Sequence, residues 1–170
     1  MEEWNALFDS CESEAKKVNE GAAAFVVVDS KKQVVAQRVI GSSDSYVNFA
    51  CMKANTVVED GNDNALWSPA AHYGECCGLT YACCGCLCCD FNMLWGACCC
   101  TKRLHLWGAL PIIIDGKIGS LAVSGGNGLD SDKAIVTEGL KHAGYENMNG
   151  TWVNENNPSA SPIENVLHRV

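Results

Sequence analysis

The sequence lacks the features that mark two large classes of protein. It has no continuous run of about 18 apolar residues, so it contains no predicted membrane span. Acidic residues outnumber basic ones by 20 to 12, which gives a formal charge of −8, and no block of Lys or Arg forms the basic stripe that phosphate backbones attract. We therefore expect neither a nucleic acid nor a membrane surface as a partner.

Two further absences concern location and catalysis. The first residues, MEEWNALFDSCESEAKK, contain neither the basic start nor the apolar stretch of a secretion signal, which predicts a cytoplasmic protein. The GxSxG motif of serine hydrolases, the phosphate-binding Walker loop and the HExxH motif of zinc proteases are all missing. These absences favour a binding protein over an enzyme.

The chain has the size and composition of one folded domain. It has 170 residues, of which 48% are hydrophobic and 19% charged. A chain of this length can bury a core without disulfides or a structural metal. We place the domain at residues 1–144 and expect residues 145–170, which are rich in Asn, Ser and Pro, to form an extended arm.

The first third of the chain predicts a helix, a hairpin and a second helix. Apolar residues recur every three or four positions from Trp4 to Val18, as in an amphipathic helix. Short apolar runs at 22–29 and 33–40 flank a polar turn and predict a β-hairpin. A second amphipathic stretch follows, which Asp44 or Ser45 can cap.

The clearest hairpin lies in the last third. Two apolar runs flank Asp115-Gly116, a dipeptide that suits a type I′ turn because Gly tolerates a positive φ. A third helix follows, with Asp130 or Ser131 as its cap and Gly144 as its stop. Because adjacent antiparallel pairs dominate and parallel crossovers are few, we predict an α+β domain with helices packed on an antiparallel sheet.

Three stretches of the chain are NEGAAAFVVVDSKKQVVAQRVIGSS, FACMKANTVV and LPIIIDGKIGSLAVSGGNGLDSDKAIVTEGLKHAG. In this order they resemble three signatures of the GlcG/HbpS-like family, often described as heme-degrading or heme-binding domains. The matching positions are Asp29, Arg38, Gly41, Lys53, Ala54, Thr56, Pro111, Ile112, Asp115, Gly116, Gly119, Val123, Ser124, Gly125 and Gly126.

The resemblance implies a profilin-like fold that forms homo-oligomers, either dimers or larger rings. It also implies a small ligand, which is heme, another tetrapyrrole or iron, and a role in redox sensing or heme handling. The cysteine-rich segment at 73–100 and the arm at 145–170 have no counterpart in the family signatures. Because three signatures match in order, our first hypothesis is a heme-binding protein.

The turn Ser124-Gly125-Gly126 is a candidate anion site. A Gly-rich turn can expose successive backbone N–H groups before a helix, and this geometry favours a carboxylate such as a heme propionate. The alternative is a tight connection from strand to helix without a ligand.

Arg38 and Lys53 are the candidate cations. A guanidinium can bind a carboxylate through two hydrogen bonds, and an ammonium can act as a point charge or, when desolvated, as a base. The alternative is a structural salt bridge, with Asp29 and Glu59 as available partners. These two cations and the glycine turn also leave open an enzyme that acts on a small carboxylate.

Histidines supply the candidate iron ligands. Neutral imidazole is a common axial ligand of heme iron. His72 and His105 bracket the cysteine-rich segment, whereas His142 and His168 are expected on the surface near the chain ends. We therefore take His72 and His105 as the candidate ligands.

Ten of the twelve cysteines fall within residues 73–100, where no helical or strand period is evident. The dense spacing resembles thiolate clusters that share Zn²⁺ or Cu⁺ and differs from a zinc finger. A thiol-rich metal store or redox buffer is therefore the main alternative function. Small buried apolar residues and disulfides remain alternative explanations of the run. The candidate metal ligands are Cys83, Cys84, Cys86, Cys88 and Cys89.

Overall fold

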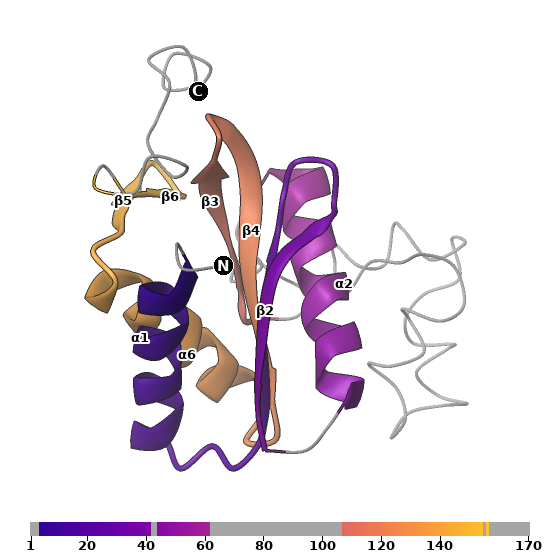
Figure 1. Cartoon of the computed structure of the whole chain (residues 1–170), viewed down its shortest axis with the longest axis vertical. Helices are drawn as coiled ribbons and strands as arrows, with labels where there is room; N and C mark the ends of the chain where they lie inside the picture. The colour runs from indigo at the N-terminus through magenta and orange to yellow at the C-terminus, as the bar shows by residue number, and fades with distance from the viewer. Residues whose placement is uncertain (1–3, 42–43, 62–106, 155, 157–170) are drawn as a thin grey trace.

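The computed structural model describes residues 4–41, 44–61, 107–154 and 156. Within them, six strands form one sheet in the order β2-β1-β4-β3-β6-β5. Helices α1 (Asn5–Lys17) and α6 (Leu129–His142) lie on one side of the sheet and α2 (Asp44–Asp60) lies on the other (Figure 1). The predicted α+β class is confirmed. No helix among the described residues is both long and apolar enough to cross a membrane.

The strand β1 (Ala23–Val28) lies inside the sheet. It pairs in antiparallel fashion with β2 (Val34–Ile40) on one side and β4 (Lys117–Gly125) on the other. All its residues are buried because helices cover both faces. Phe25 and Val27 belong to the core under α1 and α6, and Ala24 and its alternating neighbours belong to the core under α2. The first predicted hairpin is therefore confirmed.

The second predicted hairpin is β3 (Ala109–Ile114) with β4. Its turn residues Asp115 and Gly116 have φ values of 49° and 69°. Positive φ at both positions defines the type I′ turn, whose twist matches that of the flanking strands. The Asp-Gly prediction is confirmed.

The start of α6 differs from the prediction. The helix begins at Leu129, and its N-cap is Gly128, with φ of 97° and no capping side chain. Asp130 is therefore in the first helical turn, where an acidic side chain interacts favourably with the helix dipole. The predicted stop is confirmed: Gly144 adopts φ of 80°, and its N–H donates to the carbonyl of Lys141.

The first part of the expected C-terminal arm is a hairpin. Strands β5 (Glu146–Met148) and β6 (Thr151–Val153) flank Asn149 and Gly150, whose φ values of 54° and 91° are both positive. Strand β6 lies parallel to β3, with Trp152 opposite Ile112, so the sheet is mixed. Trp152 is buried in the core under α1 and α6.

The helix α2 lies close to the sheet because the side chains between them are small. Ala50 and Ala54 of the helix pack against Ala24, Ala109 and Ala122 of the strands. Small residues allow two backbones to approach each other, and the remaining space is limited. A long side chain on this face of α2 must therefore extend along the sheet and end at a specific partner.

Candidate functional site

Lys53 is a buried structural cation on α2, with 1% of its surface exposed. Its Nζ donates to the carbonyl oxygen of Val123 in β4 at 3.0 Å and to Asp132 Oδ2 in α6 at 2.5 Å. The predicted salt-bridge partners have other roles: Asp29 accepts N–H groups of the β1–β2 turn, and Glu59 pairs with a lysine of that turn. Lys53 thus joins α2, β4 and α6 across the end of the sheet.

Burial opposes both charges of this pair. It lowers the pKa of Lys53, and it raises the pKa of Asp132 to about 6; in each case the attraction of the partner opposes the shift. Both side chains are almost wholly buried. Buried partners on β4 and α6 therefore already contact the ammonium.

The glycine turn binds a carboxylate that belongs to the chain itself. The N–H of Gly126 donates to Glu20 Oε1 at 2.7 Å, and the N–H of Asn127 lies 3.2 Å from both carboxylate oxygens. Glu20 is 7% exposed, and Ser124 at the end of β4 is also buried. A Cβ atom at Gly125 would lie 2.7 Å from the carboxyl carbon of Glu20, so a side chain there would force the Glu20 carboxylate to shift.

Arg38 lies on the edge strand β2 and faces α1. Its Nη1 is 2.5 Å from Asp9 Oδ1, and its Nη2 donates to Asn5 Oδ1 at 3.1 Å. The guanidinium carbon lies 5.3 Å from the centre of the Phe8 ring, within the range of a cation–π interaction. Nη1 is also 3.7 Å from Glu12 Oε2. Asn5, Asp9 and Glu12 follow one another at steps of four and three positions, so they lie on one face of α1 beside the guanidinium.

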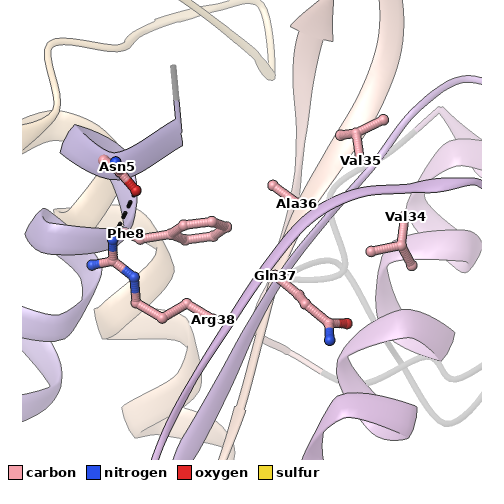
Figure 2. Close-up of a pocket in the computed structure, with 7 residues that line it drawn as sticks. All are labelled: Asn5, Phe8, Val34, Val35, Ala36, Gln37 and Arg38. Carbon is pink, nitrogen blue, oxygen red and sulfur yellow. Dashed lines mark hydrogen bonds between the residues drawn. The ribbon is translucent and has the colours of Figure 1, made fainter. Parts of the chain in front are cut away.

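A pocket of about 300 Å³ lies between α1 and β2, and we call it the α1–β2 groove. Asn5 and Phe8 of α1 and residues 34–38 of β2 line it. Figure 2 shows the Phe8 ring pointing from α1 toward β2, with the Arg38 guanidinium beside it. Val34 and Val35 are 46% and 40% exposed, so this apolar wall is open to solvent. Of the candidate cations, Arg38 lines this groove and Lys53 does not.

Other predicted ligands lie outside the described residues. They are the histidines His72 and His105 and the cysteines Cys83, Cys84, Cys86, Cys88 and Cys89. The roles assigned to these residues therefore remain predictions.

The structure describes one histidine, His142, and two cysteines, Cys11 and Cys51. His142 Nδ1 lies 2.8 Å from Glu14 Oε1, on the outside of α6. Cys11 is buried between α1 and α6, and burial raises the pKa of its thiol to about 12. Burial also raises the pKa of Cys51. Within the described residues, no three or more His, Cys, Asp or Glu side chains gather into a possible metal site.

Three acidic side chains that no sequence pattern indicated determine what the candidate cations and the glycine turn contact. Asp132 and Glu20 bind partners 79 and 106 residues away in the sequence, and Asp9 binds Arg38 from 29 residues away. No local pattern identifies such pairs. The available signal concerned Asp132 alone: it lies in the first turn of α6, where an acid also fits a favourable interaction with the helix dipole.

Comparison with known proteins identifies a family. The model of the family described as "Haem degrading protein HbpS-like" matches residues 1–141. A search of curated proteins found no match.

Several solved structures share the fold at low sequence identity. The heme complex of PduOC is similar with a TM-score of 0.58 and 18% identity, over 84% of this chain and 92% of that one. Protein ORFY of Klebsiella pneumoniae gives 0.57 and 17%, over 83% and 87% of the two chains. A double mutant of HbpS from Streptomyces reticuli gives 0.54 and 17%, over 81% and 82%. At such identities the likeness establishes the fold.

Proposed function

We propose that this chain, which belongs to the HbpS-like family of heme-degrading proteins, binds heme or a related tetrapyrrole in the α1–β2 groove. The family match over residues 1–141 is the observation that carries the proposal. The solved heme complex of PduOC, which shares the fold, is consistent with it. The role is that of a small-ligand binding protein in heme handling or redox sensing.

The groove has the chemistry that an amphipathic ring with an anionic edge requires. Val34, Val35 and Ala36 offer an apolar surface beside the buried Phe8, and Arg38 offers a cation at its side. Small-molecule sites are mostly apolar with a few placed polar groups, and they measure roughly 300–1,000 Å³. The groove, at about 300 Å³, lies at the lower end of this range, so it fits one edge of a porphyrin.

The lining residues can bind a propionate group of heme but not its iron. Arg38 fits a propionate because a guanidinium can donate two parallel hydrogen bonds to a carboxylate. None of the seven lining residues is a His, Cys, Met or Tyr, so the groove itself offers no side chain that commonly binds heme iron. The proposed axial ligand is therefore His72 or His105. Lys53 and the glycine turn are left out of the proposed site because their partners Asp132 and Glu20 are buried, whereas Asp9 beside Arg38 is exposed.

Titration of the purified protein with hemin tests the proposal. We expect a sharpened, red-shifted Soret band that saturates at micromolar protein, because the porphyrin leaves water for the apolar groove. Arg38→Gln is expected to weaken binding by roughly tenfold or more, since a hydrogen bond to a charged group contributes about 1.5–3 kcal/mol. Spectra identical to those of free hemin would overturn the proposal.

A further inference from the structure

The charge on Arg38 is already compensated before any ligand binds. Nη1 contacts the Asp9 carboxylate at 2.5 Å, through one oxygen of the carboxylate. The side chain of Asp9 is 71% exposed, whereas that of Arg38 is 25% exposed. A ligand carboxylate that approaches Arg38 in the groove therefore meets a guanidinium whose Nη1 is paired with another anion.

The exposed Asp9 is the partner that a ligand can replace most readily. Water solvates its carboxylate as soon as the contact with Arg38 opens, so the exchange leaves no buried charge behind. Exposed ion pairs of this kind contribute little to stability, typically about 0.2–1 kcal/mol. The cost of displacing Asp9 is correspondingly small.

Arg38 keeps its position when Asp9 leaves. Its guanidinium lies over the Phe8 ring, which is 3% exposed and packs against Phe25 in the core. The second terminal nitrogen of Arg38 still donates to Asn5. These two contacts hold the guanidinium on the wall of the groove, with Nη1 available to a new acceptor.

We infer that Asp9 is an internal competitor, a carboxylate that occupies Arg38 in the free protein and makes the groove selective for ligands whose own carboxylate displaces it. This inference rests on the proposed function and names a residue that sets the specificity of the same site. It predicts that the free acid form of a porphyrin competes with Asp9 and that an uncharged ester does not.

Two variants separate the effect of the Asp9–Arg38 contact from the effect of a change in net charge. Asp9→Asn removes the competing charge and keeps the shape of the side chain. Glu12→Gln removes one charge from the same helix, but Glu12 is 3.7 Å from Nη1 and pairs with Lys16 at 2.9 Å. The two proteins therefore have the same net charge and differ in whether Arg38 has lost its direct anionic partner.

Hemin and hemin dimethyl ester, which has no free carboxylate, are the two probes. We expect Asp9→Asn to bind hemin about two- to fivefold more tightly than the wild type, by the energy of one exposed ion pair. Glu12→Gln should change hemin affinity by less than Asp9→Asn does, and neither variant should change the affinity for the ester.

The outcomes distinguish this inference from the proposed function. Equal hemin affinity in the wild type and Asp9→Asn, or weaker binding by Asp9→Asn, would overturn the competitor role while hemin binding itself stands. An equal gain in Glu12→Gln would overturn it too, because net charge alone would then explain the result. Absence of hemin binding in all three proteins would overturn the proposed function and this inference with it.

Discussion

Replacement of Lys53 by Met is expected to lower the free energy of unfolding at neutral pH by about 3–5 kcal/mol, the usual effect of leaving one buried charge without its partner. Lys53 and Asp132 are almost wholly buried, and their contact at 2.5 Å links α2 to α6. Without the ammonium, the Asp132 carboxylate lies in a low-dielectric interior. Urea unfolding followed by circular dichroism measures the loss.

The deficit of Lys53→Met should shrink as the pH falls. Asp132 has a folded-state pKa of about 6, above its ordinary value of 3.8, chiefly because burial disfavours the charged carboxylate. A raised carboxyl pKa contributes stability that is present below pH 3.8 and is lost as the pH rises through about 6. Lys53 lowers this pKa, so its removal lets Asp132 take up a proton at still higher pH.

The double variant Lys53→Met, Asp132→Asn is the control for this prediction. It removes both charges, so most of the stability lost in the single variant should return, because a buried pair contributes little net stability beyond its own desolvation cost. A single-variant loss below about 1 kcal/mol, the size typical of exposed pairs, would contradict the buried-pair account. A deficit equal at pH 7.5 and pH 5 would contradict the role given to the Asp132 proton.

Replacement of Gly108 by Ala is expected to cost about 2–4 kcal/mol in unfolding free energy, from backbone strain and overpacking together. Gly108 has φ of 106°, and a Cβ there would lie 2.6 Å from Asp132 Cβ and 2.7 Å from the carbonyl oxygen of Val123. It would also lie 3.2 Å from Lys53 Nζ. The added methyl group therefore collides with backbone that cannot move without disturbing the ion pair.

Gly128→Ala is the matched control for Gly108→Ala. Gly128 has a similar φ of 97°, and, its chain neighbours aside, no atom of the described residues lies within 4 Å of a Cβ built there. Its φ of 97° and ψ of −178° lie in a backbone region essentially reserved for glycine, so its replacement should cost only the backbone strain, about 1–3 kcal/mol. Thermal or urea unfolding measures the loss of unfolding free energy in both variants. The difference between the two losses gives the cost of crowding at Gly108. Equal losses in the two variants would show that the space beside Lys53 and Asp132 is not tightly filled.

Hairpins and helices could be predicted from the sequence because their signals are local. The turn at Asp115-Gly116 could be predicted from two neighbouring residues, and helix α1 could be predicted from the spacing of its own apolar residues. The hairpin at Asn149-Gly150 has the same kind of signal, because Asn-Gly also favours a type I′ turn. The polar composition around it favoured an arm, and burial of Trp152 against the core determined the outcome.

The candidate site could be predicted only in part, because chemistry at a site depends on which side chains meet. Arg38 was identified as a candidate cation, and it does line a groove. Lys53 has the same charge, but the small residues under α2 bring it into the interior beside Asp132. The glycine turn has the expected N–H groups, but Glu20 accepts their hydrogen bonds from the segment after α1. Such competition among groups distant in sequence has no local pattern.

Amide hydrogen exchange with and without hemin tests the central claim, that the α1–β2 groove holds the porphyrin, most directly. The account predicts slower exchange of backbone amides at residues 5–9 of α1 and 34–38 of β2 when hemin is bound, because the ligand covers the edge strand and the facing helix turn. Exchange unchanged in both segments, under conditions where the Soret band shows saturated binding, would place the ligand elsewhere and contradict the account.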